Sequence, residues 1–256
     1  MNCRLCGNIN LESFANANLL KRSVNYFDCP ICGYVQTETP SWLDEAYASP
    51  INSSDTGIMV RNLANTSLVV ATLTCMGNRS GLVVDYAGGY GFLVRLLRDA
   101  GIDAYWADPY SENLVARGFE YQGRDGTKLV TTFEAFEHFV NPYDEMKALL
   151  SIAPNILLTT NVISTPAPSP SDWWYYGLEH GQHIGFYRVR TLQHLADKFG
   201  LHLLTDGVSK HFFSEKKYSY SAWRILMRSA RYFPKLFSFG LKAKTWSDHL
   251  KFQTIF

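Results

Sequence analysis

The sequence feature that most constrains the fold is a glycine-rich turn that joins an apolar run to an amphipathic segment. Residues 81–85, Gly-Leu-Val-Val-Asp, are apolar without alternation, which predicts a short strand buried on both faces. Residues 85–91, Asp-Tyr-Ala-Gly-Gly-Tyr-Gly, place three glycines in four positions directly after it. The leucines and the phenylalanine that follow fit one face of a helix ended by Gly101. This order predicts the first strand, turn and helix of an α/β domain.

The same alternation of strand-like and helix-like segments continues along the chain. Further strands are predicted at 104–107, 128–133, 155–162, 201–205 and 218–227, and helices from Asn141-Pro142 and from a Thr191 cap. Residues 43–74 are predicted to be mainly helical. Alternating strands and helices indicate a mainly parallel, Rossmann-like sheet covered on both faces.

Four segments differ in composition and define the expected domain organisation. They are a cysteine-containing module at 1–40, a helical connection at 41–80, the α/β domain at 81–227 and a basic aromatic tail at 228–256. A chain of 256 residues, 46% hydrophobic, can bury one sizeable core and a small additional module.

The net charge and the hydropathy of the chain limit which binding partners and which cellular location we expect for the protein. The formal net charge is +1, so no global electrostatic argument favours nucleic acid, and no nucleic-acid partner is expected. The first residues lack the apolar core of a signal peptide, and no run approaches 18 consecutive apolar residues. We therefore expect a soluble, cytoplasmic protein. The oligomeric state is not predictable from these features.

The glycine-rich turn is the expected cofactor site, because ligands of such sheets bind beyond the carboxyl ends of the strands. A dinucleotide fingerprint, G-x-G-x-x-G, fails in register: counted from Gly89 the third glycine position is Val94, and counted from Gly88 the second glycine position is already Tyr90. A nicotinamide-dependent oxidoreductase is therefore disfavoured. Asp108 ends the second strand, 23 positions after Asp85, where a carboxylate can accept hydrogen bonds from two ribose hydroxyls.

The turn resembles the D-x-G-x-G-x-G loop of class I S-adenosylmethionine-dependent methyltransferases, with Ala87 in place of the first glycine and an additional Gly88. The resemblance implies that Asp85 lies near the methionine amino group of the cofactor. It implies that Gly89 and Gly91 line the methionine and ribose portions. The cofactor-binding set expected on this basis is Asp85, Ala87, Gly88, Gly89, Gly91, Asp108 and Glu134.

Two further segments resemble the methyltransferase family often called type 23. Residues 134–142 match E-x-x-E-H…P, and residues 183–192 match H-I-x-F-Y…T-L. A cysteine-rich start, the glycine-rich loop and Asp108-Pro109-Tyr110 occur together in sugar-modifying members. A second large C-terminal domain, found in the deoxysugar C-methyltransferases, is not recognisable here. The resemblance implies methylation of a sugar, nucleotide sugar or surface glycan.

The cysteines form two C-x-x-C pairs that suit a metal. Cys3 and Cys6 are separated from Cys29 and Cys32 by 22 residues, and four thiolates suit a closed structural Zn²⁺ site. The alternative is four ordinary thiols. Cys75 stands alone in an apolar stretch and is expected in the core.

Histidines are the candidate bases for an acceptor that must lose a proton, since their pKa lies near physiological pH. In order of preference they are His183, His138 and His180. Glu134 and Glu137 can orient a histidine or the methionine amine, although placement at a helix start explains them equally well. The aromatic run at 173–176 can cover a substrate or pack in the core.

Other functions and contacts are compatible with these patterns. A zinc-containing binding or scaffold protein with a methyltransferase fold but no turnover is the main alternative. The basic aromatic tail after Arg228 can rest on an anionic membrane surface, or pack against the domain or another subunit.

Overall fold

The computed structural model describes residues 1–47, 55–233 and 237–253. It contains two compact units: unit 1 comprises 1–52, 134–150 and 158–215, and unit 2 comprises 53–133, 151–157 and 216–256. The strands are β1 Ser13–Leu19, β2 Arg22–Asp28, β3 Val35–Thr37, β4 Leu82–Tyr86, β5 Ala104–Ala107, β6 Thr127–Phe133, β7 Asn155–Thr159, β8 Gly185–Phe186, β9 His202–Thr205 and β10 Lys210–Ser214. The α-helices are α1 Leu43–Ala46, α2 Ile58–Cys75, α3 Phe92–Asp99, α4 Pro142–Ile152, α5 Val189–Lys198, α6 Tyr220–Tyr232 and α8 Thr245–Gln253, with 3-10 helices η1 Phe136–His138 and η2 Trp174–Tyr176.

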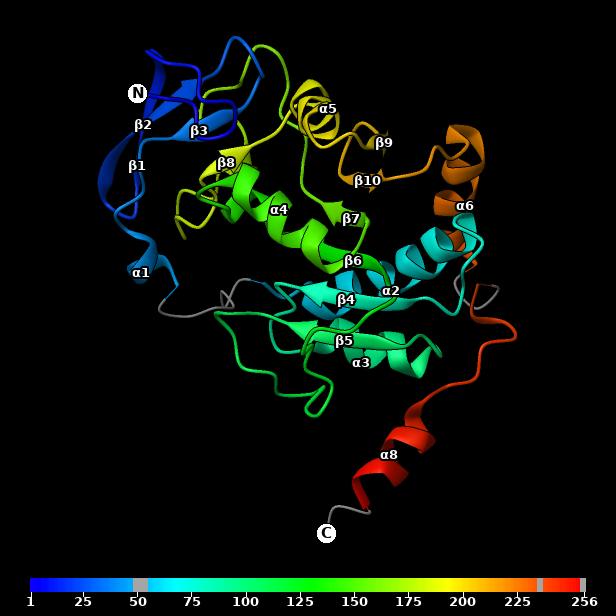
Figure 1. Cartoon of the computed structure of the whole chain (residues 1–256). Coiled ribbons are helices and arrows are strands. Elements are labelled where there is room, and N and C mark those ends of the chain that lie inside the picture. Colours follow the sequence, from blue (N-terminus) through cyan, green and yellow to red (C-terminus); the bar gives the residue numbers. More distant parts are fainter. Residues whose placement is uncertain (48–54, 234–236, 254–256) are drawn as a thin grey trace. The chain divides into compact units, whose positions relative to one another are not determined.

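Unit 2 is built around parallel strands. β4 lies between β5 and β6 and runs parallel to both, with Val84 opposite Tyr105 on one side and Val130 on the other. Val83 and Val84 are fully buried, as expected of a strand covered on both faces. α3 leads from β4 back to β5 and contacts it (Figure 1). This strand, helix, strand unit confirms the prediction from residues 81–107.

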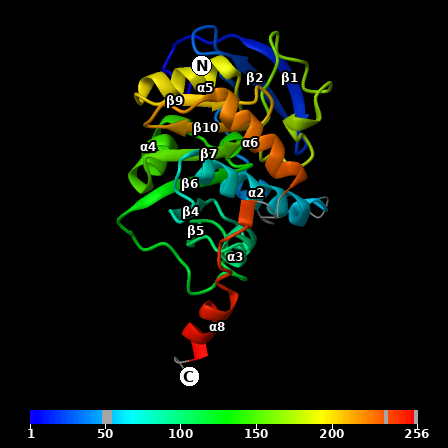
Figure 2. The ribbon, with the colours of Figure 1, turned by 90° about the vertical axis from the view of Figure 1, so that its right-hand side faces the viewer.

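α2 and α6 pack against each other in unit 2 (Figure 2). Residues 68–73 of α2 are buried, and Trp223 of α6 is fully buried. By its length of 18 residues and mean hydropathy of 1.2, α2 also meets the criteria for a membrane-spanning helix, which core helices of soluble proteins meet as well. The predicted helical character of residues 43–74 corresponds to α1 and α2, and residues 48–54 lie outside the described residues.

The strand predicted at 218–227 is wrong, because this segment belongs to α6. Trp223, Met227 and Ala230 are its buried residues, and their spacing of three and four is helical. The side chain of Ser219 caps the helix by accepting a hydrogen bond from the backbone N–H of Ala222. The strand is instead β10, eight residues earlier, where four consecutive buried residues give no alternation.

α8 lies against α3 within unit 2. Asp248 accepts hydrogen bonds from the guanidinium groups of Arg98, at 2.7 and 2.8 Å, and of Arg95, at 2.8 Å. The Phe252 ring meets Phe119 edge to face at a centroid distance of 5.5 Å. The part of the tail that the structure describes here is therefore packed on its own domain through a buried ion pair and an aromatic contact.

In unit 1, β7 is followed in the sheet by β10 and β9. β10 and β9 are antiparallel, with Phe212 opposite Leu204. The sheet order on the other side of β7 is β6, β4 and β5, and β7 belongs to both units, since its first three residues lie in unit 2. The protein therefore has the predicted α/β fold with a mainly parallel central sheet and an antiparallel pair at one edge.

A second sheet, also in unit 1, has the antiparallel order β1, β2, β3, β8. β8 comes from far along the chain and pairs with β3, with Phe186 opposite Val35. The apolar core beneath it combines the N-terminal strands with the aromatic segment, and includes Tyr26, Trp42, Tyr175, Tyr176 and Phe186. The N-terminal sheet therefore includes a strand from outside residues 1–40.

Arg188 connects the N-terminal segment to α5. Its guanidinium donates to both carboxylate oxygens of Asp28, each at 2.7 Å, and to the carbonyl of Gly33 at 2.8 Å. Arg188, not Thr191 as predicted, is the N-cap of α5. The Thr191 hydroxyl accepts a hydrogen bond from the Arg188 backbone N–H in a capping box, because the helix begins earlier than the sequence suggests.

Replacing Arg188 is expected to weaken unit 1. Arg188→Ala leaves Asp28 without its bidentate partner and should lower the free energy of unfolding by roughly 3 kcal/mol. Chemical denaturation followed by circular dichroism measures this change. Arg190→Ala is the matched control, since Arg190 is exposed and its side chain donates a long hydrogen bond of 3.4 Å to the Pro30 carbonyl. Equal stability of the two variants would contradict the prediction.

Candidate functional site

Asp85, near the carboxyl end of β4, is a buried acid that accepts a hydrogen bond from the neighbouring strand β6. Its side chain is nearly inaccessible, and the Thr131 hydroxyl of β6 donates to its Oδ1 at 2.7 Å. Burial raises the pKa of Asp85 to about 7, the Thr131 hydrogen bond opposes this rise, and the negative charge of Asp108 adds to it. A carboxyl in this state gains most from a ligand that brings a positive charge.

The loop after β4 turns through left-handed backbone conformations. Ala87, Gly89 and Gly91 have φ values of 59°, 54° and 88°. A Cβ on Gly91 would lie 2.6 Å from Oδ1 of Asn113, so no larger residue fits there without displacement. Ala87 departs from the glycine pattern in residue type but keeps a conformation that glycine favours. The loop thus leads from β4 into α3 through backbone conformations that glycine favours.

Asp108 organises this loop in the structure. Its Oδ2 accepts the backbone N–H of Gly89 at 2.9 Å, and its Oδ1 accepts the N–H groups of Tyr110 and Ser111 at 2.8 and 2.9 Å. The Trp106 indole donates to the Gly89 carbonyl at 2.8 Å. Hydrogen bonds to Gly89 therefore link the loop after β4 to the end of the adjacent strand β5. A carboxylate offers about four acceptor positions, so binding of ribose hydroxyls by Asp108 stays a prediction.

Residues 134–138 follow β6 and lie in unit 1. The backbone N–H of Glu134, which has a φ of 50°, donates to the carbonyl and hydroxyl of Thr159, each at 3.1 Å. Glu137 is fully buried, and the Tyr175 hydroxyl donates to its Oε1 at 2.6 Å. Its Oε2 has no hydrogen-bond partner within the described residues. Burial raises the pKa of Glu137 to about 7, against the effect of the Tyr175 hydrogen bond.

The three candidate histidines gather beside Glu137. The ring centroids of His138 and His183 are 5.0 Å apart, and those of His180 and His183 are 4.8 Å apart. Burial, followed by the neighbouring imidazoles, lowers the pKa of His138, and burial is also the largest cause of the lowered pKa of His183 and His180. We call Glu137, His138, His180 and His183 the histidine cluster.

Hydrogen bonds to backbone atoms fix two of the histidine tautomers. Nδ1 of His183 lies 2.6 Å from the Tyr175 carbonyl, which only accepts, so Nδ1 carries the proton and Nε2 keeps a lone pair. Nδ1 of His180 accepts the Gln182 backbone N–H at 3.1 Å, so neutral His180 carries its proton on Nε2. His183 thus presents an acceptor nitrogen, and His180 a donor. Nδ1 of His138 is hydrogen-bonded to the Tyr47 hydroxyl at 2.6 Å.

Sequence reasoning missed Tyr47 and the role of Tyr175. Tyr175 and Tyr176 are buried core residues, which agrees with the packing alternative for the aromatic run, while Trp174 is 78% exposed. Tyr175 holds Glu137 with its hydroxyl and His183 with its carbonyl. No local sequence signal links Tyr47 to a histidine 91 residues later.

The four predicted metal ligands meet at one point. Their sulfur atoms lie within 4.8 Å of one another, with Cys3 to Cys32 and Cys6 to Cys29 both at 3.6 Å. Thiolates bound at 2.3 Å to a tetrahedral zinc ion would be about 3.8 Å apart, so the donor set and its spacing fit zinc. A second group of metal-ligand type, Glu137, His138 and His183, also has one ligand atom of each residue within 4.8 Å.

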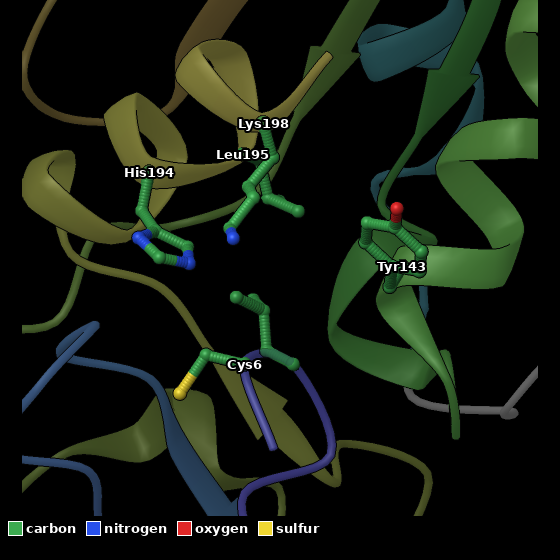
Figure 3. A pocket seen from close by; sticks show the side chains of 6 residues that line it. Cys6, Tyr143, His194, Leu195 and Lys198 are labelled. Carbon is green, nitrogen blue, oxygen red and sulfur yellow. The ribbon is translucent and has the colours of Figure 1, made fainter. Parts of the chain in front are cut away.

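A cavity of about 260 Å³ opens beside Cys6 in unit 1 (Figure 3). Residues from α4 and α5 line it together with the N-terminal segment, and they are Leu5, Cys6, Tyr143, His194, Leu195 and Lys198. Nε2 of His194 is buried and has no hydrogen-bond partner in the part of the chain that the structure describes. The histidine cluster does not contribute to its lining.

Comparison with known proteins identifies one family. The family model described as "Methyltransferase domain", of type 23, matches residues 61–206, which is more than half of the chain. No curated protein matches the sequence significantly.

Solved structures of similar fold are distant in sequence. Magnesium protoporphyrin IX methyltransferase from Synechocystis PCC 6803, with bound SAH, is 18% identical over 67% of this chain and 90% of that one, with a TM-score of 0.45. An O-methyltransferase family protein from Burkholderia thailandensis is 12% identical, with a TM-score of 0.48, over 69% of this chain and 63% of that one. This chain therefore spans less than two thirds of the Burkholderia protein. The plantazolicin methyltransferase in complex with SAH is 10% identical over 69% of this chain and 93% of that one, with a TM-score of 0.47.

Binding of an ammonium-bearing ligand at Asp85 should depend on pH. The pKa of Asp85 is raised to about 7, so its ionised form, which attracts a cation, is lost as the pH falls through 7. The affinity for S-adenosylhomocysteine should therefore decrease about tenfold between pH 8 and pH 6. Isothermal titration calorimetry measures it.

Two variants control for other titrating groups. Asp85→Asn should bind more weakly at pH 8 and lose most of the pH dependence. Asp144→Asn removes an acid whose side chain is 69% exposed and should keep the wild-type slope. An affinity that does not change with pH in the wild type would contradict the assignment of Asp85.

Proposed function

Because the chain belongs to the type 23 methyltransferase family, we propose that it transfers the methyl group of S-adenosylmethionine to a sugar, a nucleotide sugar or a surface glycan. Binding of S-adenosylmethionine is supported mainly by the loop after β4. There the buried acid Asp85 precedes three residues in the left-handed backbone conformation. Support for a sugar acceptor comes from the joint occurrence of the cysteine pairs, this loop and Asp108-Pro109-Tyr110 in the sequence.

The cofactor would be held by charge at one end and by hydroxyl recognition at the other. Asp85 would bind the methionine ammonium, and Asp108 the ribose hydroxyls. Backbone groups of Gly88, Gly89 and Gly91 would approach the cofactor closely, since these residues have no side chain. Glu134, which follows β6 directly in the chain, is the remaining residue of the predicted cofactor-binding set.

The histidine cluster would prepare the acceptor. In the transfer, a lone pair of the acceptor forms a bond to the methyl carbon, the carbon–sulfur bond breaks, and its electrons neutralise the sulfonium. The acceptor proton must leave, and His183 would remove it through the Nε2 lone pair; the hydrogen bond of its Nδ1 to the Tyr175 carbonyl supports this role. The donor N–H of His180 suits an acceptor oxygen. His138 ranks between them because its tautomer depends on Tyr47.

We also propose that Cys3, Cys6, Cys29 and Cys32 hold a structural Zn²⁺ ion. The sulfur spacing supports this assignment, and a closed site of four thiolates leaves no open position for substrate. The non-enzymatic alternative, a zinc-containing scaffold of methyltransferase fold, would bind S-adenosylmethionine without consuming it. Cytoplasmic location and contact of the C-terminal tail with anionic lipid stay predictions.

Removing the histidines should reduce turnover without reducing cofactor affinity. A panel of nucleotide sugars and glycans is incubated with methyl-labelled S-adenosylmethionine, and labelled products are identified by mass spectrometry. With the acceptor so found, His183→Ala and His138→Ala should lower kcat by roughly 100-fold or more, since proton transfer by a positioned group contributes at least that much. The Kd of S-adenosylhomocysteine should stay at the wild-type value.

His202→Ala is the matched control, because His202 is exposed on β9 and should leave kcat unchanged. Label transfer at the wild-type rate in both cluster variants would exclude the cluster from the reaction. Cofactor binding without any labelled product from the panel would favour the scaffold alternative.

The zinc site should be detectable independently of activity. Plasma mass spectrometry of purified protein should find at least one zinc ion per chain. Cys29→Ser should lose it and lower the midpoint of thermal unfolding, because a structural zinc site contributes folding energy. Cys75→Ser, outside the cluster, should retain the zinc. Metal-free wild-type protein with unchanged thermal stability would contradict the proposal.

A further inference from the structure

We infer that Glu137, His138 and His183 hold a divalent transition-metal ion, which binds an oxygen atom of the methyl acceptor. One carboxylate oxygen and one nitrogen from each ring lie within 4.8 Å of one another. All three residues belong to unit 1, so the site is described within one compact unit. It is separate from the four cysteines, whose sulfur donors suit a structural ion.

The donor set has the composition of a substrate-binding metal site. Two imidazoles and one carboxylate form the ligand set of non-haem Fe(II) sites, and imidazole also suits Zn²⁺ and Ni²⁺. Ligands at roughly 2.1 Å from an ion lie about 3 Å apart, so modest side-chain rotation brings the three atoms into coordination. Three protein ligands leave positions open for oxygen atoms of a ligand.

The outer hydrogen bonds resemble those that orient metal ligands. A metal-binding histidine usually donates its other ring N–H to a carbonyl or carboxylate, which fixes the tautomer. His183 does so through Nδ1 to the Tyr175 carbonyl at 2.6 Å. Nδ1 of His138 is held by the Tyr47 hydroxyl, also at 2.6 Å. In both rings Nδ1 is occupied by these hydrogen bonds, so Nε2 is the nitrogen that would bind the ion.

The buried carboxylate of Glu137 is not explained by a role of the histidines as bases. Glu137 is fully buried, its Oε1 accepts the Tyr175 hydroxyl, and its buried Oε2 has no hydrogen-bond partner among the described residues. An unpaired buried carboxylate oxygen is costly, and removal of a proton by an imidazole does not need it. A cation bound by Oε2 and the two imidazoles satisfies this oxygen.

The use of the ion rests on the proposed function, whereas its binding does not. A bound cation would lower the pKa of the acceptor hydroxyl, so that its proton would leave to water instead of to His183, and the resulting alkoxide would attack the methyl carbon. His138 and His183 then act as ligands of the ion. Two open positions suit neighbouring hydroxyls of a sugar ring or the pyrophosphate of a nucleotide sugar. Acceptors with one isolated hydroxyl should react more slowly.

The test measures metal binding by full-length protein that retains its zinc. Cobalt(II) is titrated into the protein, and the visible d–d absorption together with metal content gives stoichiometry and Kd. We expect one equivalent of Co²⁺ beyond the cysteine-bound metal. Glu137→Gln, which keeps the size of the side chain, and His183→Gln should each raise the Kd of this ion at least tenfold. Glu12→Gln, a surface acid outside the cluster, should bind as the wild type does.

Zinc content and circular dichroism of each variant confirm that the fold is retained. The inference is overturned if wild-type protein takes up no second equivalent of Co²⁺, Zn²⁺, Mn²⁺ or Fe²⁺, or if both cluster variants bind it with wild-type affinity. Methyl transfer by protein shown to lack a second ion would overturn this inference and leave the proposed function standing. Binding of the ion without methyl transfer to any acceptor would instead count against the proposed function.

Discussion

The hydrogen bond between Tyr175 and Glu137 is the interaction on which the histidine cluster depends. Tyr175 belongs to the aromatic core of unit 1, so its position is fixed by packing against residues such as Phe186. Its hydroxyl holds Glu137, and its carbonyl holds His183 in one tautomer. A core residue thereby determines the state of two polar groups that belong to segments about 45 residues apart.

Asp85 and Glu137 are buried acids in similar environments. Asp85 in unit 2 and Glu137 in unit 1 are each removed from water, each accepts a hydrogen bond from a hydroxyl group, and burial raises the pKa of each to about 7. A carboxyl so placed is poorly stabilised as an anion until a cation arrives. In the proposed enzyme these cations differ: an ammonium group of the cofactor at Asp85 and a metal ion at Glu137. The same local chemistry would then serve two different ligands.

The features that could be predicted from the sequence are those determined by residues close together in the chain. The strand, turn and helix at 81–99 and the spacing of the cysteines follow from neighbouring residues, and the structure agrees with both. The segment 218–227 was misassigned because aromatic and β-compatible residues masked a helical spacing that only burial reveals. The contact of Tyr47 with His138 and the pairing of β8 with β3 join distant segments, which no periodicity encodes. The residues predicted to bind cofactor and acceptor stay predictions, since their roles depend on ligands.

The pairing of β8 with β3 also has a consequence for synthesis of the chain. β1, β2 and β3 are complete by residue 37, but the fourth strand of their sheet ends at Phe186. On the ribosome, β3 therefore waits with one open edge while about 150 further residues are added, which takes roughly 10 to 30 s at common elongation rates. During this interval the cysteine pairs can already close around an ion, whereas the sheet cannot. The first module to appear is thus among the last to be finished.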